Sequence, residues 1–413
     1  MPEYQLKTQV CIIGAGPAGC AASAFLSQRK IPHVLVDKAQ FPRDKICGDA
    51  LSGKVTSILR DLGIDYLPFL GTEVKPFYPS WGVLFSAPDG GEVAVPFKHE
   101  PAQDAPSPGF ISKRLDFDNF LVENLNPEFC QFIQNEAVKD VSVNQDSAIC
   151  NTENYTIQAE ILLGADGTRN ILGKQYLGFS LERDHYCSGL RQYWSGVKDL
   201  SKEGYIELHF VDGALPGYFW IFPLPNGEAN VGIGMLSSYI SKHKVDLKKL
   251  MQEVIESDKF KARFESAQAL EKPKGWGLPL GSKQRALSAD RMMVLGDAAS
   301  LIDPFTGEGI GNAMMSGKIA AAVIDNAIQS RNFNASSLLE YDKKIYAKLG
   351  GELRLSRILQ KLIRYPWLFN WMIRKIRNNS ELRKTITFMF EDVNLRKQFT
   401  RPSFYLKLLF NRS

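Results

Sequence analysis

The stretch Gly14-Ala15-Gly16-Pro17-Ala18-Gly19 follows directly on the apolar run Val10-Cys11-Ile12-Ile13. The apolar run predicts a strand buried on both faces, and the Ala-rich residues 20–26 predict a helix. Strand, glycine turn and helix in this order are typical of a dinucleotide site, with the pyrophosphate over the helix N-terminus. Gly14 would allow the tight turn, Gly16 the approach of the backbone to the pyrophosphate, and Gly19 the close packing of helix on strand. We expect these glycines and Ala18 to bind the cofactor.

An acidic residue completes this unit. Val34-Leu35-Val36 predicts a second strand, which ends at Asp37. Asp37 is placed to accept hydrogen bonds from adenosine ribose hydroxyls, and Lys38 beside it is a further candidate for cofactor binding. The alternative is that these residues form only a simple glycine turn and a surface Asp, without a cofactor site. The unit alone also leaves NAD and FAD as alternatives.

Two later motifs decide between these cofactors. Ile161-Leu162-Leu163 runs into Gly164-Ala165-Asp166-Gly167, and an apolar run at 292–295 leads into Gly296-Asp297-Ala298-Ala299. These motifs resemble those of the FAD-dependent monooxygenase superfamily, which has the p-hydroxybenzoate hydroxylase fold. The resemblance implies FAD as the cofactor and an α/β fold, with a Rossmann-like FAD-binding domain, a β-sheet substrate domain and a helical C-terminal region. It also implies that Asp166 and Gly167 contact FAD and that Asp297 holds the ribitol.

The same resemblance assigns roles to two other segments. Gly309, Ile310 and Gly311 would start a helix aimed at the flavin pyrimidine ring, where a helix N-terminus stabilises the negative charge of a reduced flavin. Arg114 begins a loose match to the family's Arg-x-x-Phe-Asp pattern, with Phe117 and Asp118 at the right offsets. We expect Arg114 to bind the cofactor. The alternative is a solvated arginine at a helix start.

One branch of the superfamily fits best. Phe41-Pro42-Arg43-Asp44-Lys45-Ile46-Cys47-Gly48-Asp49 resembles the Pro-x-x-Lys-x-Cys-Gly stretch of the geranylgeranyl reductase subfamily, and so do residues 217–224, 229–234 and 303–312. This resemblance implies reduction of C=C bonds in a hydrophobic, isoprenoid-type substrate. It places Cys47 and Gly48 beside the isoalloxazine, with Cys47 as the acid that protonates the alkene. Alternatively, Cys47 is a small thiol that packs the loop. Lys45 and Asp49 either tune Cys47 or lie in solvent.

Other activities of this fold remain as alternatives. Flavin-dependent halogenases carry Trp-x-Trp-x-Ile-Pro where this chain has Tyr218 and Phe222 in place of the first Trp and the Ile, so halogenation is disfavoured. A monooxygenase or epoxidase acting on an apolar or aromatic substrate needs few fixed side chains and is the main alternative. A flavoprotein that only carries electrons at a membrane surface is another. The chain has no second glycine fingerprint, so NAD(P)H or another electron donor must act transiently.

Domain bounds follow from the strand and turn patterns. We expect the FAD-binding domain to comprise residues 1–70, 110–178 and 286–330, and the β-sheet substrate domain residues 71–109 and 179–285. Asp89-Gly90-Gly91 predicts a hairpin turn between strands at 81–86 and 92–97. Residues 331–413 are expected to be helical. The aromatic residues expected along the substrate pocket, under the sheet, are Tyr193, Trp194, Phe219, Trp220, Phe222 and Phe305.

Composition restricts the compartment and the partners. The chain has 413 residues, six cysteines without a Cys-x-x-Cys pair, and five histidines, which predicts no metal site and a reduced, cytoplasmic protein. It shows no signal region and no apolar run of spanning length. Residues 343–413 hold 17 Lys and Arg against 4 Asp and Glu, interleaved with Trp and Phe. This basic C-terminal region predicts contact with an anionic membrane surface, or else packing on the flavin domain. No nucleic-acid-binding module is visible.

Overall fold

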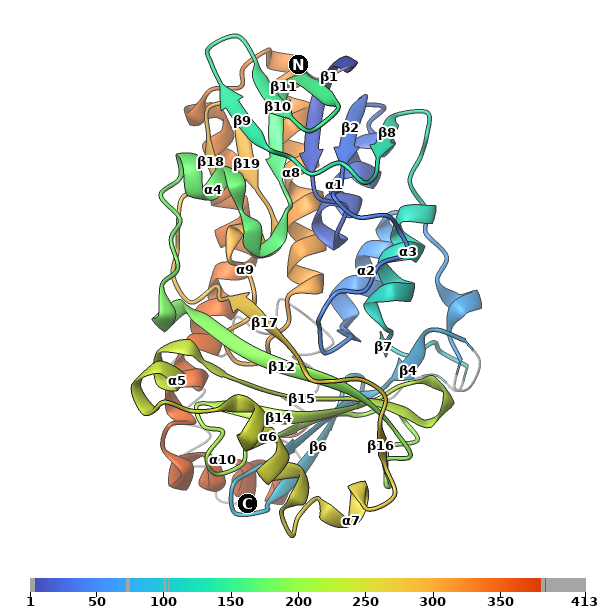
Figure 1. Cartoon of the computed structure of the whole chain (residues 1–413), viewed down its shortest axis with the longest axis vertical. Helices are drawn as coiled ribbons and strands as arrows, with labels where there is room; N and C mark the ends of the chain where they lie inside the picture. The colour runs from blue at the N-terminus through green and yellow to red at the C-terminus, as the bar shows by residue number, and fades with distance from the viewer. Residues whose placement is uncertain (1–3, 72–74, 100–101, 103, 380–382, 384–413) are drawn as a thin grey trace.

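The computed structural model describes residues 4–71, 75–99, 102, 104–379 and 383, and two large sheets organise them (Figure 1). The first sheet has the strand order β18-β19-β11-β1-β2-β8, with β10 on β11 and β9 on β10. Its strands are β1 (Tyr4–Ile13), β2 (His33–Val36), β8 (Cys130–Ile133), β9 (Asp140–Val143), β10 (Ala148–Asn151), β11 (Tyr155–Gly164), β18 (Ser288–Ala289) and β19 (Met292–Val294).

The centre of this first sheet is parallel and fully covered. β1 pairs in parallel with both β2 and β11, and residues 10–13 of β1 are buried, as the continuous apolar run predicts. Helix α1 (Pro17–Gln28) packs against α8 (Ile310–Ser330). Their close approach depends on Gly317, because a Cβ there would lie 2.6 Å from the carbonyl oxygen of Ala18. The α/β class with a Rossmann-like half is therefore confirmed.

The second sheet is mostly antiparallel and lies below the first in Figure 1. Its order is β16-β12-β15-β14-β13-β5-β6, with β17 also paired to β12. The strands are β5 (Gly82–Ser86), β6 (Glu92–Pro96), β12 (Tyr186–Ser195), β13 (Ile206–His209), β14 (Gly217–Pro223), β15 (Glu228–Leu236), β16 (Gln268–Ala269) and β17 (Lys274–Pro279). The predicted hairpin joins β5 and β6, with Gly90 at φ 82°.

Side chains on the two faces of this second sheet enter different clusters. One face packs on α6 (Leu247–Glu256) and α7 (Lys261–Phe264), whereas Leu208, Trp220 and Phe222 belong to a cluster on the other face. A small third sheet, which we did not expect, pairs β7 (Gly109–Ile111) with β3 (Ala50–Leu51) and β4 (Tyr78–Ser80). β4 falls within the segment 71–109 expected in the substrate domain, yet it pairs outside the second sheet.

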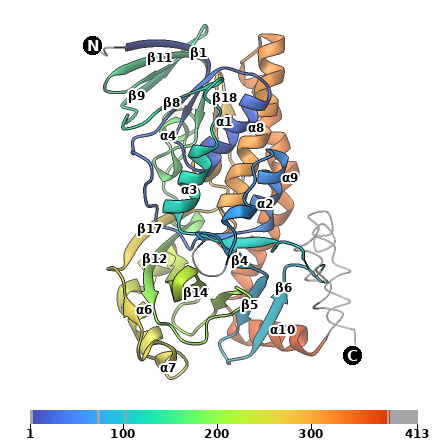
Figure 2. The same ribbon diagram turned by 90° about the vertical axis from the view of Figure 1, so that its right-hand side faces the viewer.

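Long helices connect the two halves. α8 and α9 (Ala335–Leu362) run along one side of the molecule, and α10 (Pro366–Asn378) lies beside β6 at the far end (Figure 2). The remaining helices are α2 (Gly53–Asp61), α3 (Arg114–Glu123), α4 (Ile171–Tyr176) and α5 (Ser237–His243). Among the described residues, none of the helices combines the length and apolarity that a membrane crossing requires. Residues 380–382 and 384–413 of the predicted basic region lie outside the described residues.

Candidate functional site

A single large cavity connects the first sheet with the second. Its volume is about 1440 Å³, which exceeds the roughly 300–1,000 Å³ of a typical small-molecule site. At one end it is lined by the glycine turn, the start of α8 and the loop that carries Cys47. At the other end it is lined by the second sheet, α9 and α10. The cavity therefore has room for a dinucleotide and a second ligand.

The glycine turn has the geometry that its sequence predicts. Gly14 has φ 103°, and a Cβ on it would lie 2.5 Å from the carbonyl oxygen of Ala165. A Cβ on Gly19 would lie only 1.8 Å from the carbonyl oxygen of Gly14. Gly16 faces open space, because the nearest atom to its virtual Cβ is a guanidinium nitrogen of Arg43, 3.9 Å away. The turn thus leaves room for a pyrophosphate above α1.

Asp37 braces this turn from the end of β2. Its Oδ2 accepts a hydrogen bond of 2.7 Å from the backbone N–H of Ala15, and its Oδ1 accepts one of 2.8 Å from that of Ala39. A carboxylate offers about four lone-pair sites, so both oxygens can still accept ribose hydroxyls. Asp37 and Lys38 line the cavity. Their placement fits an adenosine group at this edge of the sheet.

The other two motifs meet the glycine turn at the same place. Asp166 Oδ2 accepts from the backbone N–H of Ile171 at 2.9 Å, while its Oδ1 is buried without a hydrogen-bond partner among the described residues. Asp297 Oδ1 lies 3.5 Å from the virtual Cβ of Gly309, directly before α8. Burial raises the pKa of Asp297, and the positive charges of Lys45 and Arg114 oppose that rise. Together these polar groups form a cradle that fits FAD.

Arg114 is buried, so a solvated arginine at the helix start is the wrong interpretation. Only 6% of it is exposed, and its Nε and Nη2 donate to Asp118 at 2.6 and 2.7 Å. Arg43 donates to the same carboxylate at 2.8 Å and lies over Gly16. Arg43, a candidate phosphate ligand, was not among the residues expected to bind the cofactor. The only signal was a positive charge within the stretch that precedes Cys47.

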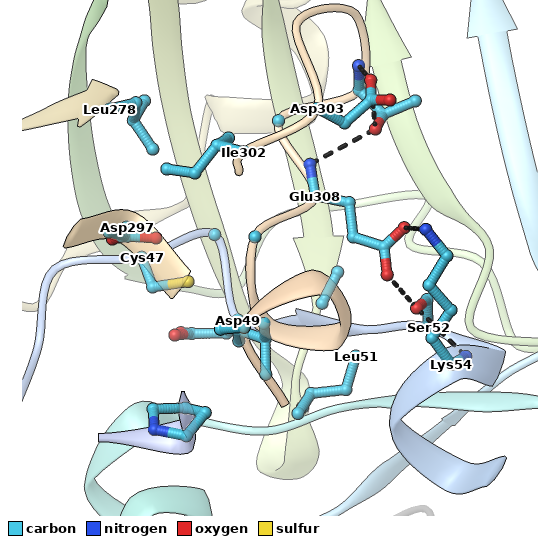
Figure 3. Close-up of a pocket in the computed structure, with 18 of the residues that line it drawn as sticks. Cys47, Asp49, Leu51, Ser52, Lys54, Leu278, Asp297, Ile302, Asp303 and Glu308 are labelled. Carbon is cyan, nitrogen blue, oxygen red and sulfur yellow. Dashed lines mark hydrogen bonds and ion pairs between the residues drawn. The ribbon is translucent and has the colours of Figure 1, made fainter. Parts of the chain in front are cut away.

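The loop of Cys47, Gly48 and Asp49 forms part of the cavity wall drawn in Figure 3. The carbonyl oxygen of Cys47 accepts a hydrogen bond of 2.8 Å from Asn230 Nδ2, and a Cβ on Gly48 would lie 3.0 Å from the ring of Phe222. The thiol itself is half-buried and lies near the Arg114 side chain. The thiol, a group that can donate a proton, thus lines the cavity beside the predicted flavin site.

Neither Lys45 nor Asp49 lies in solvent. The Lys45 ammonium is 3.6 Å from the ring centroid of Trp276, and burial lowers its pKa to about 8. Asp49 is fully buried, and its Oδ2 accepts hydrogen bonds of 2.7 Å from both Tyr193 Oη and Asn230 Nδ2. Burial raises the pKa of Asp49 to about 7, although these hydrogen bonds oppose the rise. Asn230 was not among the predicted site residues.

The predicted aromatic lining requires three corrections. Trp220, Phe222 and Phe305 line the cavity. Trp194 and Phe219 instead belong to the cluster on the opposite face of the sheet, where their rings lie 5.2 Å from Phe264 and 5.1 Å from Phe260. Successive side chains of a strand point to opposite faces, so neighbours such as Phe219 and Trp220 could not both line the cavity. Tyr193 does not line the cavity either, although its hydroxyl group donates a hydrogen bond to Asp49.

A polar cluster that the sequence analysis also missed holds the loop before α8. Glu308 accepts a hydrogen bond from Ser52 and pairs with Lys54 at 3.6 Å, as Figure 3 shows. Lys54 Nζ also donates to Asn312 at 2.8 Å and to Glu352 of α9 at 2.9 Å. These residues come from three distant segments of the chain. No local sequence pattern indicates that they meet.

The far end of the cavity is apolar. It is lined by Val83, Phe85, Ile206, Leu208, Leu359, Ile363, Leu368, Phe369, Trp371, Met372 and Ile373. The last seven belong to α9, α10 and the link between them. These helices were expected to contact a membrane or to pack on the flavin domain, and not to line the substrate cavity. Ile363, Phe369 and Ile373 are buried in the cluster of the second sheet. The C-terminal helices are therefore part of the site.

Comparison with known proteins agrees with this geometry. The family described as FAD binding domain matches residues 7–333, which is most of the chain. The chain belongs to this family. It is an FAD-dependent oxidoreductase, because it matches this family, relatives of similar length are named as reductases, and its cradle fits FAD. Within the described residues, no group of three or more His, Cys, Asp or Glu side chains is placed to hold a metal ion.

Two named relatives and two solved structures resemble this FAD binding domain protein. A menaquinone reductase of Mycobacterium tuberculosis is 30% identical over 337 residues, covering 78% of this chain and 77% of that protein. A digeranylgeranylglycerophospholipid reductase of Methanococcus aeolicus is 30% identical over 364 residues, with coverage of 85% and 86%. A geranylgeranyl bacteriochlorophyll reductase-like protein of Thermoplasma acidophilum superposes with a TM-score of 0.80 at 20% identity, covering 96% and 99%. A flavin-dependent brominase has a TM-score of 0.74 at 20% identity, with 93% of each chain covered.

Proposed function

We propose that this oxidoreductase reduces C=C bonds in the hydrophobic chain of a lipid-type, isoprenoid-containing substrate. The observation that carries the proposal is the continuity of one cavity from the glycine turn to an apolar compartment of the second sheet, α9 and α10. An apolar chain in that compartment would reach the Cys47 loop with its double bonds. The relatives named menaquinone reductase and digeranylgeranylglycerophospholipid reductase support this substrate class.

The residues of the cradle would hold FAD in two parts. Asp37, Lys38, the glycine turn and Arg43 would bind the adenosine and the pyrophosphate, while Asp166, Gly167 and Arg114 would lie along the middle of the cofactor. Asp297 and the start of α8 at Gly309, Ile310 and Gly311 would face the ribitol and the flavin. FAD bound there supplies, once reduced, a hydride to one carbon of the alkene.

The neighbouring carbon then needs a proton, and we propose Cys47 as the donor. Its thiol lies beside Arg114, in the wall where the apolar compartment meets the cradle. Transfer of the proton to carbon leaves a thiolate, which regains a proton from solvent before the next turnover. Trp220 and Phe222 line the cavity next to this loop and would exclude water from the reacting carbon. Cys47 would then be the catalytic acid.

The electron donor is a further part of the proposal. The sequence contains one glycine fingerprint, which the FAD site uses, so NAD(P)H or another donor would bind transiently to reduce the flavin. A flavin monooxygenase or epoxidase is the alternative function. The brominase with the same fold is only 20% identical and supports the fold alone. Two positions of the halogenase motif Trp-x-Trp-x-Ile-Pro also differ in this chain, because Tyr218 replaces the first Trp and Phe222 replaces the Ile.

We also propose that the protein meets its substrate at an anionic membrane surface. Trp367 and Tyr365 are 69% and 57% exposed at the start of α10, and Ile358 near the end of α9 is 52% exposed. Arg374, Lys375 and Arg377 follow on the same helix, whose buried side lines the cavity. Basic residues beside exposed aromatics suit an interfacial helix, and the arrangement would bring the cavity close to lipid.

Oxygen dependence tests the proposed function against its alternative. Purified protein would be supplied with NADPH, or with dithionite as a chemical donor, and a lipid bearing geranylgeranyl chains. We expect donor consumption and a product with two more hydrogen atoms per reduced bond, with and without oxygen. A product that gains an oxygen atom and forms only in air would establish a monooxygenase. Donor oxidation without any lipid product would favour the electron carrier.

A further inference from the structure

A hydrogen-bonded network joins the Cys47 loop to the second sheet. Asn230, on β15, donates to the carbonyl oxygen of Cys47 at 2.8 Å and to Asp49 Oδ2 at 2.7 Å. Its Oδ1 accepts from Trp220 Nε1 at 2.9 Å. Trp220 and Phe222 in turn line the cavity next to Gly48. One amide group therefore connects the loop, a buried carboxyl group and the aromatic wall.

The chemistry of its partners fixes how this amide is oriented. An indole N–H can only donate, and a backbone carbonyl can only accept. Asn230 must therefore point its oxygen at Trp220 and its nitrogen at Cys47. The second hydrogen of that nitrogen needs an acceptor in a buried setting, because an unmade buried hydrogen bond is costly. Asp49 Oδ2 supplies this acceptor.

The backbone and the surroundings of Asp49 hold its carboxyl group where it can accept from Asn230. Its backbone is left-handed, with φ 70°, a conformation that Asp adopts more readily than most residues other than glycine. Its carbonyl oxygen accepts a hydrogen bond of 3.0 Å from Ser112, which anchors the far end of the loop. The carboxyl group is fully buried, and its Oδ1 has no hydrogen-bond partner among the described residues.

We propose that Asp49 is a positioning residue for Cys47 and that it acts through Asn230. By accepting from Asn230, Asp49 holds the amide that fixes the Cys47 carbonyl, and so sets where the thiol stands against the wall of Trp220 and Phe222. The inference rests on the proposed function for the role of Cys47. The effect of Asp49 on the position of the thiol does not depend on whether Cys47 is the proton donor.

Several titratable and charged groups surround Asp49, but its protonation need not break the network. Tyr193 and Arg191 face it from β12, Arg114 faces it from α3, and Cys47 shares its loop. Lys113 lies 5.0 Å from the ring centroid of Tyr193, and Asp44 pairs with Arg191 at 3.1 Å. Because burial raises the pKa of Asp49 to about 7, both forms exist near neutral pH. A proton on Oδ1 would leave both hydrogen bonds to Oδ2 intact.

Two substitutions separate hydrogen-bond acceptance from charge. Asp49→Ala removes the acceptor of Asn230. Asp49→Asn keeps an oxygen that can accept from Tyr193 and Asn230, but it cannot titrate. The first readout is the alkylation rate of Cys47 by iodoacetamide in FAD-loaded protein, measured by mass spectrometry of the Cys47 peptide. Asp342→Asn is the matched control, because Asp342 is another buried carboxyl group with a raised pKa, bound to Leu287 and Ser288 outside the cavity.

We expect Asp49→Ala to change the alkylation rate by about 10-fold, the order of effect of one lost buried hydrogen bond. We expect Asp49→Asn and Asp342→Asn to stay close to wild type at pH 7. If Asp49→Ala does not fold or bind FAD, Asn230→Ala tests the same connection and should reproduce its effect. An unchanged rate in the alanine variants would overturn the proposal. Equal changes in Asp49→Ala and Asp49→Asn would also overturn it.

Turnover provides the second readout. In a wild-type protein that reduces alkenes, Asp49→Ala should lower kcat about 10-fold more than it alters KM, and Asp49→Asn should restore most of that loss, because its side-chain oxygen can still accept from Asn230. An equal fall of kcat in Asp49→Ala and Asp49→Asn would contradict the role of Asp49. If wild-type protein reduces no alkene, the proposed function fails, but the alkylation experiment still decides this inference.

Discussion

Arg43 and Arg114 share the carboxylate of Asp118, with Nη1 of Arg43 at 2.8 Å and Nε of Arg114 at 2.6 Å. The shared anion holds two guanidinium groups along one wall of the cavity. Arg43 extends this wall over Gly16, where the pyrophosphate of a bound FAD would lie. A contact between residues 75 positions apart in the sequence would thereby complete the proposed phosphate site.

The first prediction concerns this arginine. Arg43→Met should weaken FAD binding by about 10-fold or more, since a hydrogen bond to a charged group contributes roughly 1.5–3 kcal/mol. Fluorescence titration of apoprotein with FAD measures the effect. Lys249→Met is the control, because Lys249 is exposed on α6, outside the cavity lining. An unchanged dissociation constant in Arg43→Met would remove Arg43 from the phosphate site.

The second prediction concerns Cys47. Cys47→Ser should retain FAD but slow alkene reduction by about 10-fold or more, the lower end of what one positioned proton donor supplies. Turnover with a geranylgeranyl lipid and flavin absorbance measure the two effects. Cys130→Ser makes the same chemical change at a buried thiol on β8 and should keep normal turnover. Full turnover in Cys47→Ser would make Cys47 a packing residue.

The third prediction concerns pH and stability. Folded Asp49 has a pKa of about 7, above its ordinary value of 3.8, so the folded state binds more protons than the unfolded state between these pH values. The free energy of unfolding should therefore fall as pH rises from 4 to 7 and level off above 7. Asp49→Asn lacks this titration. The free energy of unfolding of Asp49→Asn minus that of wild type should therefore increase from pH 4 to pH 7, by on the order of 2–4 kcal/mol. Urea unfolding at several pH values measures the difference, and parallel curves would contradict it.

The fourth prediction concerns the membrane surface. Trp367→Glu should weaken binding to anionic vesicles, because it replaces an exposed aromatic by a negative charge beside a basic helix. Wild-type binding should also weaken as salt screens the basic residues. Leu181→Glu is the matched control, since Leu181 is 65% exposed elsewhere. Cosedimentation measures binding, and equal binding of Trp367→Glu and wild type would count against the proposal.

Deletion from residue 361 onward would be a poor test of membrane binding. It would remove Ile363, Phe369 and Ile373, which are buried against the second sheet. It would also open the apolar end of the cavity, which these side chains line. A loss of binding or of folding could then reflect the lost core. Point changes at exposed positions avoid this.

The sequence predicts local structure well where one residue type is required by geometry. Gly14 and Gly19 lie where a Cβ would collide with backbone, and Gly90 turns the predicted hairpin. Such requirements are visible in a single short motif. The cofactor half of the site could be predicted for this reason. Asp166 and Asp297, the acidic residues of the other two motifs, likewise line the cavity.

Side-chain direction and distant contacts could not be predicted in the same way. Phe219 and Trp220 are equally aromatic, and only the phase of β14 separates them. Lys54 meets Glu308 and Glu352 across hundreds of residues, which no spacing rule indicates. The apolar face of α10 was visible as a pattern, but the surface that it covers depends on the packing of two sheets.

The central claim is that FAD in this cavity reduces a C=C bond of an apolar chain. Anaerobic protein would be reduced with one equivalent of dithionite and mixed with a geranylgeranyl lipid, and flavin absorbance would be followed during a single turnover. We predict reoxidation of the flavin together with a lipid that gains two hydrogen atoms by mass spectrometry. A flavin that stays reduced until oxygen is admitted, with no hydrogenated lipid, would contradict the claim.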